Sequence, residues 1–468
     1  MTRLRYVLPF LSLSLLAACA MGPDYQRPSI DVPASYKEDY GAWRRATPQD
    51  ETDRGAWWSF YKDPALNDLE KQVEISNQNL KAAEATWSEA SAVVEESLAS
   101  LFPTVAVNAT SGRKVGTMPT LTATNSLYGS ASWTPDVWGR IRRGVESDQA
   151  KAHASAADLA SAKLAMQATL ATDYFDLRAQ DELKRLFDRA TEVDTKALRI
   201  AQGQYTSGAG ALADVLAAQT QLENVQAQSM NAAVRRAQLE HALAVLVGKP
   251  PAEFSLQPKF TIDPAPEVPL GLPSALLERR PDIASAERLV AASNAQIGVA
   301  QAAWFPNLTL SSSAGYAGEA LSKLLQTSNS FWAVGPALAE AIFDGGAREA
   351  RAKQASADYD RSVANYRQTV LAAFQQVEDG LASMRILAEE RATQEAAVAH
   401  ARAVEKLALS QYKRGVAPYA DVLTAQSAEL TNEQALLMTR QSRMDASVAL
   451  IQALGGGWSG DEFSSGHD

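Results

Sequence analysis

Two long stretches of the chain carry apolar side chains at the spacing of coiled-coil helices. In the first, the spacing alternates between four and three residues, at Leu186, Ala190, Val193, Ala197 and Ile200. In the second, an apolar residue recurs every seven positions, at Leu423, Leu430, Leu437, Met444 and Ile451. Both patterns are typical of helices that pack along a narrow seam. The helices are predicted to be long, because no proline occurs between Pro135 and Pro250 or between Pro336 and Pro418. From Gly139 to Tyr205, a rise of 1.5 Å per residue gives a rod of about 100 Å.

Four shorter runs alternate apolar and polar residues, as half-buried strands do. In the first pair, the apolar positions are Val105, Val107 and Ala109, followed by Leu127, Gly129, Ala131 and Trp133. In the second pair, Leu308, Leu310 and Tyr316 alternate with Thr309, Ser311 and Ser313, and residues 331–338 form a return run. Each run has about ten residues, the length of a tilted strand that crosses a bilayer.

These patterns occur twice because the chain contains an internal repeat. Gln204-Tyr205-Thr206-Ser207-Gly208 corresponds to Gln411-Tyr412-Lys413-Arg414-Gly415, and the same offset of 207 residues sets Asp214 on Asp421. Leu101-Phe102-Pro103 matches Trp304-Phe305-Pro306 at an offset of 203. A weaker correspondence places Trp138-Gly139-Arg140 near Asp344-Gly345-Gly346, each before a long helical run. Each copy is predicted to follow the order helix, strand, strand, very long helix, turn, helix.

The strand count predicts an oligomer. Beyond the N-terminus, no stretch has the length of a transmembrane helix, so any membrane span must be built from strands. Four strands cannot close a barrel, because the smallest membrane barrels have about eight. Two copies would give eight strands and an interior filled with side chains, whereas three copies would give twelve strands and a lumen.

The N-terminus has the features of a bacterial lipoprotein signal. Arg3 and Arg5 precede an apolar stretch that ends in Leu16-Ala17-Ala18-Cys19. This stretch is too short for a stable membrane anchor and is predicted to be a cleaved export signal. Cys19 would then carry a diacylglyceryl group on its thiol and an acyl chain on its amine, and several chains anchor better than one. Met21 stands where an aspartate would signal inner-membrane retention, so transport to the outer membrane is expected. The alternative is an ordinary secretory leader with an incidental cysteine.

Composition and charge exclude several classes of function. The formal net charge of −10 argues against a nucleic-acid partner. Cys19 is the only cysteine, so its lipidation would leave no thiol for a disulfide, a zinc cluster or catalysis. His153, His241, His400 and His467 show no metal-ligand spacing, and the sequence contains no phosphate loop or nucleophile elbow. We therefore expect no enzymatic activity, no metal and no cofactor apart from the covalent lipid on Cys19.

The expected organisation has six parts. They are a lipoprotein signal peptide at 1–18, a lipid-anchored segment at 19–59, a first repeat at 60–250, a proline-rich connector at 251–274, a second repeat at 275–457 and a tail at 458–468.

Several motifs together resemble the TolC-type outer-membrane efflux proteins, in the lipoprotein branch of NodT-like and OprM-like channels. Besides the repeat, they are Cys19 followed by Gly22-Pro23-Asp24-Tyr25-Gln26-Arg27-Pro28, Trp57-Trp58 with Asp63-Pro64-Ala65-Leu66, and Arg279-Arg280-Pro281-Asp282-Ile283. The resemblance covers nearly the whole chain after the signal. It implies a TolC-like α+β fold, in which a trimer forms a twelve-stranded outer-membrane β-barrel that continues as a periplasmic α-helical barrel.

The resemblance also implies a function and partners. The chain would be the passive outer-membrane channel of a tripartite efflux pump, beside a periplasmic adaptor and an inner-membrane transporter of the resistance-nodulation-division type. The favoured cargo is drugs and other small molecules, with metal cations or a secreted polypeptide of a type I system as alternatives. A structural periplasmic coiled-coil lipoprotein is the alternative outside the channel class, although it does not explain the four strands.

The two duplicated turns would be the periplasmic tips. In TolC-like channels the aspartate at the place of Asp421 points into the closed mouth, and Thr424 stands where a second narrowing residue is common. Tyr412 matches a tyrosine that latches the closed state, with Asp214 as its acceptor, but the accompanying basic residue is replaced by Ala417. The adaptor would dock at the turns of Gly208 and Gly415. In a purely structural role, the glycines would end one helix and the aspartates would cap the next.

Overall fold

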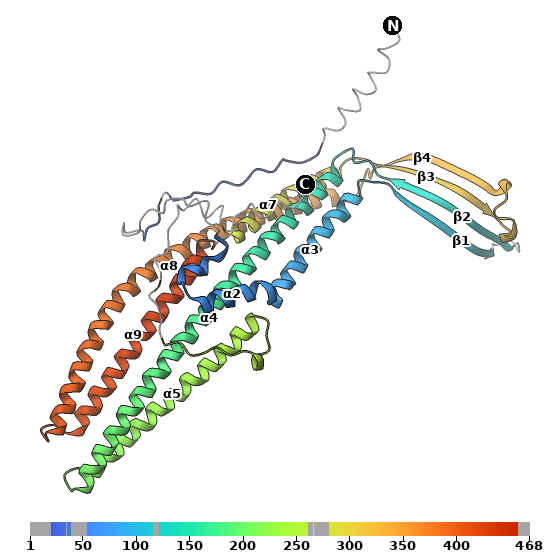
Figure 1. The fold of residues 1–468 in the computed structure, drawn as a ribbon. Coiled ribbons are helices and arrows are strands. Elements are labelled where there is room, and N and C mark those ends of the chain that lie inside the picture. Colours follow the sequence, from blue (N-terminus) through green and yellow to red (C-terminus); the bar gives the residue numbers. More distant parts are fainter. Residues whose placement is uncertain are drawn as a thin grey trace. The chain divides into compact units, whose positions relative to one another are not determined.

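The computed structural model describes residues 20–33, 35–38, 54–115, 121–260, 265 and 280–456. The predicted signal peptide 1–18, Cys19 and the tail 458–468 lie outside the described residues. The helices are α2 (Pro64–Ser76), α3 (Gln78–Ala99), α4 (Arg140–Thr206), α5 (Leu212–Leu246), α7 (Pro281–Ala302), α8 (Ala347–Lys413) and α9 (Tyr419–Ala453) (Figure 1). The strands are β1 (Thr104–Val115), β2 (Leu121–Trp133), β3 (Asn307–Gly318) and β4 (Ser330–Ala339). Short 3-10 segments are η1 (Arg54–Tyr61), η2 (Pro251–Glu253), η4 (Leu321–Lys323) and η5 (Thr327–Asn329).

The predicted element order is confirmed in both copies. The first copy runs α3, β1, β2, α4, turn, α5, and the second runs α7, β3, β4, α8, turn, α9. The long helices α4 and α8 have 67 residues each, and α5 and α9 have 35 each. Equal helix lengths in the two copies agree with duplication of one unit.

The structure confirms the predicted coiled-coil seam of α9 more fully than that of α4. In α9, Met444 and Ile451 are buried, and the three preceding members of the heptad are half-buried. In α4, Leu186 and Ala197 are buried, but Val193 is 43% exposed. The first seam is therefore interrupted in a single chain.

The four strands form one antiparallel sheet in the order β1-β2-β3-β4. Its central pair, β2 and β3, joins the two copies, and β1 and β4 are its edges. Val107, Gly129, Ala314 and Trp332 are successive partners across the sheet and share one face. On this face Val105, Val107, Trp332 and Val334 are 72% to 79% exposed.

The opposite face of the sheet is largely polar. Asn108 donates through Nδ2 to the Ser130 hydroxyl at 2.9 Å, and the hydroxyls of Thr110 and Ser126 lie 2.6 Å apart. The period-two pattern of the sequence therefore separates an apolar face from a polar face, as predicted.

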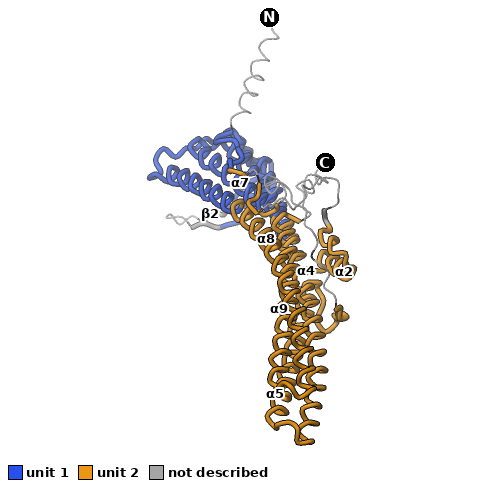
Figure 2. The backbone as a smooth tube through the Cα atoms, turned by 90° about the vertical axis from the view of Figure 1, so that its left-hand side faces the viewer, with its two compact units in different colours: residues 1–30, 85–157, 283–369 blue, residues 31–84, 158–282, 370–468 orange. Residues whose placement is uncertain are grey.

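The chain divides into two compact units (Figure 2). Unit 1 comprises residues 1–30, 85–157 and 283–369 and contains the sheet. Unit 2 comprises residues 31–84, 158–282 and 370–468 and contains both helix turns. In the described part of the chain, no helix has both the length and the apolar character needed to cross a membrane.

An aromatic core organises unit 2. Trp57 and Trp58 are buried edge to face with their ring centroids 6.0 Å apart, and Tyr61 lies 4.8 Å from Phe175 of α4. The Tyr61 hydroxyl and the Ser447 hydroxyl of α9 are 2.8 Å apart. Tyr61 therefore joins η1, which also contains Trp57 and Trp58, to two helices that lie far away in the sequence.

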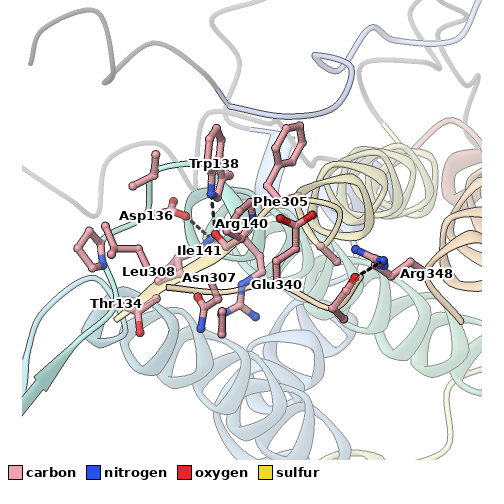
Figure 3. Close-up of a pocket in the computed structure, with 17 residues that line it drawn as sticks. Thr134, Asp136, Trp138, Arg140, Ile141, Phe305, Asn307, Leu308, Glu340 and Arg348 are labelled. Carbon is pink, nitrogen blue, oxygen red and sulfur yellow. Dashed lines mark hydrogen bonds between the residues drawn. The ribbon is translucent and has the colours of Figure 1, made fainter. Parts of the chain in front are cut away.

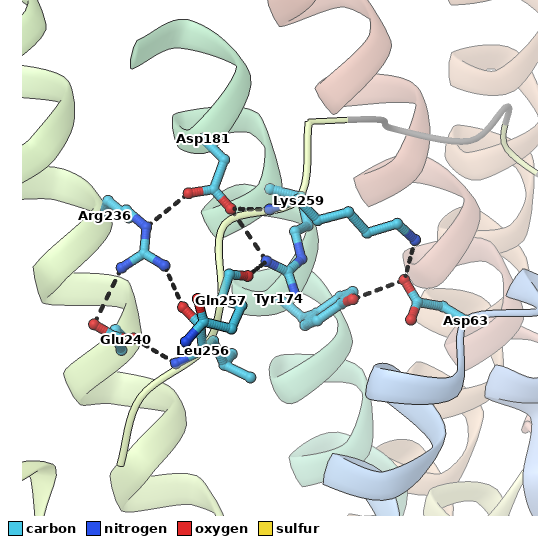
Figure 4. Close-up of polar contacts among 9 residues, drawn as sticks. Asp63, Tyr174, Asp181, Arg236, Glu240, Leu256, Gln257 and Lys259 are labelled. Carbon is cyan, nitrogen blue, oxygen red and sulfur yellow. Dashed lines mark hydrogen bonds and ion pairs between the residues drawn. The ribbon is translucent and has the colours of Figure 1, made fainter. Parts of the chain in front are cut away.

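The connector that follows α5 is held by charged groups rather than by its own secondary structure (Figure 4). Asp181 of α4 accepts from Arg236 Nε at 2.6 Å and from the backbone N–H of Lys259 at 3.1 Å. Arg236 of α5 also donates to the Leu256 carbonyl. Beyond the single turn of η2, residues 254–260 form neither helix nor strand, in agreement with the extended connector that the prolines predict.

Asp63 connects this network to α2. Its carboxylate accepts from the backbone N–H groups of Ala65 and Leu66 at the helix start, and Pro64 follows it. The Tyr174 hydroxyl and the Lys259 ammonium also donate to it, at 2.7 and 2.9 Å. Burial alone would raise the pKa of Asp63, but the hydrogen bonds and the Lys259 charge lower it below the ordinary value.

Candidate functional site at the two helix turns

The two turns have the same backbone geometry. Gly208 and Gly415 have positive φ angles of 75° and 70°. In each turn an N–H closes back on a glutamine carbonyl, Ala209 to Gln204 at 2.8 Å and Val416 to Gln411 at 3.0 Å. Only glycine adopts this conformation without strain, which explains why it recurs at both helix ends. A Cβ at either position would meet no atom within 4 Å, so both turns are open on that side.

The expected capping role of the two aspartates is wrong. The N-cap residues are Ala211 for α5 and Pro418 for α9, and neither has a side-chain capping bond. Asp214 and Asp421 lie in the first turns of these helices, where their charges interact favourably with the helix dipole. This placement leaves both carboxylates available for other contacts.

Asp421 and Thr424 lie on one exposed face of α9. They are three residues apart, a spacing that puts side chains on the same side of a helix. Both are exposed, and the Thr424 hydroxyl donates to the Ala420 carbonyl of its own helix at 2.9 Å. Asp214, in the corresponding place on α5, is half-buried.

A small cluster packs the two helical hairpins together near the turns. Its buried members are Ala197 and Ala201 of α4, Ala218 of α5, Ala408 and Tyr412 of α8, and Tyr419, Val422 and Ala425 of α9. The rings of Tyr412 and Tyr419 are 5.1 Å apart. Because most other members are alanines, the two tyrosines provide much of the apolar area of this contact.

Tyr412 makes the polar link between the hairpins. Its hydroxyl donates to Gln204 Oε1 at the end of α4, not to the expected acceptor Asp214. Burial raises the pKa of Tyr412, and the nearby Asp214 carboxylate raises it further. Asp214 therefore lies close to the link without accepting its hydrogen bond. Ala417, where the resemblance implies a basic residue, is half-buried in the second turn.

Sequence reasoning missed four residues of this site: Gln204, Tyr419, Asp194 and Gln426. Burial raises the pKa of Asp194 to about 6, although Gln221 donates a hydrogen bond to it. Burial also raises the pKa of Tyr419 to about 12, with Asp194, Tyr412 and Asp214 adding to the effect. Gln426 is 7% exposed, and its amide atoms have no partner among the described residues. The repeated Gln-Tyr pair at 204–205 and 411–412 was the one signal that pointed to Gln204.

The two hairpins meet through small side chains, the hydrogen bond from Tyr412 to Gln204 and the buried Gln426. In the described residues, no three His, Cys, Asp or Glu side chains are placed to share a metal ion.

Residues 20–27, here called the N-terminal segment, are fixed in unit 1. Arg143 of α4 pairs with Asp24 at 2.7 Å, and the Tyr25 hydroxyl donates to Glu287 of α7 at 2.6 Å. Arg27 donates to the Tyr366 hydroxyl of α8 at 3.1 Å. The motif after Cys19 therefore contacts three helices, α4, α7 and α8.

Close backbone contacts add to this fit. Gly22 has a φ of +95°, and a Cβ there would lie 2.5 Å from the Cα of Gly298. A Cβ on Gly139 would lie 2.7 Å from the Cα of Ala20. Ala20, which directly follows Cys19, thus lies against the start of α4.

A pocket of about 310 Å³ lies in unit 1, where strands meet helices (Figure 3). Trp138 stacks on Phe305 in its wall with the ring centroids 4.7 Å apart and donates through Nε1 to the Pro306 carbonyl. Arg140 and Glu340 also line it. The pocket belongs to the joint between the sheet and the helices.

The predicted pairing of Gly139 with Gly345, before the two long helices, is wrong by one residue. Gly139 and Gly346 both have positive φ and directly precede these helices, so the copies align here at 207 residues, one residue away from the expected pairing. At each helix start, an aspartate carboxylate accepts a hydrogen bond from a backbone N–H group, that of Ile141 for Asp136 and that of Arg348 for Asp344. Each aspartate also pairs with an arginine side chain, Asp136 with Arg142 at 3.2 Å and Asp344 with Arg348 at 2.9 Å.

The duplicated long hairpins, with two strand pairs joined in one sheet, define the class of TolC-like outer-membrane channel subunits. A family model described as outer membrane efflux protein matches residues 69–249 and 272–456. The chain belongs to this family, which is one of efflux conduits rather than enzymes.

Individual relatives agree with this assignment. The chain is 31% identical to the solvent efflux pump outer membrane protein SrpC of Pseudomonas putida, over 97% of this chain and 98% of the relative. It is 30% identical to nodulation protein T of Rhizobium leguminosarum bv. trifolii, over 97% of each. The solved outer-membrane channel OprN superimposes with a TM-score of 0.87 at 29% identity, covering 94% of this chain and all of that one. The protein is thus an outer-membrane channel component of an efflux pump.

Proposed function

We propose that three copies of the chain form a passive conduit for drugs and other small molecules, gated at the helix turns. The observation that supports the trimer is the open sheet, since β1 and β4 present their edges at the ends of a four-stranded array. An unpaired strand edge is a template for another strand. Edge-to-edge joining of three chains would give twelve strands in a closed sheet with a lumen.

The apolar face of the sheet supports the orientation of this assembly. Val105, Val107, Trp332 and Val334 would face lipid, and the hydroxyl-rich face would line the lumen. Mass measurement of the detergent-extracted protein tests the stoichiometry. A species of three chains is the expected result, and a monomer or dimer would contradict it.

The cargo is proposed from the relatives. Three of them are described as outer membrane proteins of efflux pumps for antibiotics, toluene or solvents, all of which are small molecules. A deletion strain should become more sensitive to such compounds and regain resistance with the intact gene. Sensitivity limited to metal salts, or loss of a secreted protein alone, would favour the alternatives.

The gate is proposed at Asp421. Three exposed carboxylates around one axis would attract cations and narrow the mouth, with Thr424 one turn further on. Asp421→Ala should increase single-channel conductance or weaken block by multivalent cations in planar bilayers. Asp68→Ala, at an exposed position of α2, serves as the control. Conductance and block equal to those of the wild type would exclude Asp421 as a gate residue.

The remaining partners are a periplasmic adaptor and an inner-membrane resistance-nodulation-division transporter, which would supply the energy. The adaptor would dock at the open turns of Gly208 and Gly415, where the backbone leaves free space. The conduit itself would need no catalysis.

We also propose that Cys19 carries the lipid. The position of Ala20 against Gly139 supports this, because it places the residue next to Cys19 at the start of α4, which follows β2 in the chain. Cys19→Ser should abolish incorporation of labelled fatty acid. Undiminished labelling of that variant would contradict the assignment.

A further inference from the structure

We infer that Tyr205 of one subunit packs against Gln411 of the neighbouring subunit, repeating between chains the contact that Tyr412 and Gln204 make within a chain. The inference rests on the proposed trimer and names the residues that would close its ring at the turns.

The contact within the chain joins one face of each copy. The first copy supplies Gln204 and Ala197 from α4. The second copy supplies Tyr412 from α8 and Tyr419 from α9. The hydrogen bond from Tyr412 to Gln204 lies beside the tilted contact between the rings of Tyr412 and Tyr419.

The repeat identifies the counterparts of these four residues in the other copy. At the offset of 207, Gln204 corresponds to Gln411 and Ala197 to Val404. In the reverse direction, Tyr412 corresponds to Tyr205 and Tyr419 to Leu212. The polar pair is therefore conserved between the copies as the same two residue types.

Three of the four counterparts are exposed where the original residues are buried, whereas Gln204 and Gln411 are both half-buried. Tyr412 is 6% exposed and Tyr205 is 45%. Tyr419 is 2% exposed and Leu212 is 51%. Ala197 is 5% exposed and Val404 is 55%. Within the described part of the chain, neither Tyr205 nor Gln411 makes a side-chain hydrogen bond.

The differences in exposure arise because a single chain covers only one contact face of each copy. In a ring of alternating first and second copies, every hairpin has two neighbours and needs two contact faces. Within a single chain, one face of each copy packs against the other copy. The face with Tyr205 and Leu212 on the first copy and the face with Gln411 and Val404 on the second copy remain uncovered. These two faces carry the same Tyr–Gln pair as the faces that already meet, beside apolar Leu212 and Val404, so the occupant that fits them is a second copy of this chain.

The correspondence also places Asp421. It occupies the position of Asp214, which lies near Tyr412. The proposed gate carboxylate would then border the contact between subunits as well as the mouth.

Cross-linking with a matched control tests the contact. Tyr205→Cys combined with Gln411→Cys is treated with a bismaleimide, because a hydrogen bond between two long side chains leaves the Cα atoms too far apart for a disulfide. The control combines Gln204→Cys with Tyr412→Cys. We expect the first pair to give covalent dimers and trimers on denaturing gels, and the control to link only within one chain. Leu212→Cys with Val404→Cys provides a second pair from the same exposed faces.

The possible results distinguish a wrong assignment of this contact from a wrong assignment of the trimer. Native mass measurement that shows trimers, with neither test pair linking chains, would overturn the contact and leave the proposed function standing. Absence of trimers would remove both. Single-cysteine variants detect any reaction through Cys19.

A functional measurement adds an independent criterion. Removing one hydrogen bond of ordinary strength should shift the closed-to-open equilibrium about fivefold per contact. Tyr205→Phe should therefore raise open probability in the same direction as Tyr412→Phe, whereas Tyr359→Phe, away from the turns, should not. A Tyr205→Phe channel that behaves like the wild type while Tyr412→Phe opens would contradict the inference.

Discussion

Individual glycines decide the fit of the N-terminal segment. Gly22 and Gly298 approach so closely that neither position has room for a methyl group. A Cβ on Gly298 would lie 2.6 Å from the Met21 carbonyl oxygen and 2.9 Å from the Arg143 side chain. The sequence shows Gly22 as part of a motif, but it cannot show Gly298, because the two residues become neighbours only after folding.

Gly298→Ala should therefore displace the N-terminal segment. Overpacking of this kind typically costs about 1–3 kcal/mol. Amide hydrogen exchange of residues 20–27 should become faster while the sheet stays protected. Gly144→Ala in α4 is the matched control, since a Cβ there meets nothing within 4 Å and helix propensity improves. Equal exchange in both variants would argue against the close approach.

At the scale of the elements, the prolines and the hydrophobic periods predicted the long helices and the strands, and the structure confirms them. The helix starts could not be predicted as well. Asp214 and Asp421 had capping chemistry, yet the chain enters each helix at Ala211 and Pro418, because the turn geometry after Gly208 and Gly415 decides where the helix begins. Similarly, a hydrogen bond such as that from Tyr412 to Gln204 depends on how two hairpins pack.

The cap of α2 gives a prediction with a defined pH dependence. The pKa of Asp63 is lower in the folded chain than in the unfolded one, so its contribution is present at neutral pH and is lost as pH falls through the folded-state pKa. Asp63→Asn should cost about 2 kcal/mol of unfolding free energy at pH 7 and progressively less below about pH 4. Urea unfolding in detergent at several pH values measures this, with Asp68→Asn on the same helix as control. A cost that does not change with pH would contradict the charged cap.

Asp445 of α9 should behave in the opposite way. Burial, together with the Asp176 carboxylate, raises the pKa of Asp445 to about 7. The folded chain therefore favours the protonated form, and this preference stabilises below about pH 4 and is lost as pH rises through 7. Asp445→Asn should raise the urea midpoint at pH 8 and change it little at pH 4. A lower midpoint at pH 8 would show that the charged carboxylate has a favourable partner.

For the whole molecule, the duplication predicted the architecture. It did not predict that corresponding residues of the two copies are buried to different extents. Tyr205 and Tyr412 stand in the same sequence motif, yet only Tyr412 is buried, because one chain brings together one face of each copy. No pattern in a single copy distinguishes the two tyrosines. Their different exposure arises from the packing of the two copies within one chain.

The N-terminal segment has a consequence for the order of folding. Its partners Glu287 and Tyr366 follow it by 262 and 339 residues. Contacts between such distant positions form late, since the intervening chain must be made and arranged first. The end of the protein that emerges first would thus be among the last parts to settle. Its protection from proteases would serve as a maturation marker, reporting that the second repeat has reached its native structure.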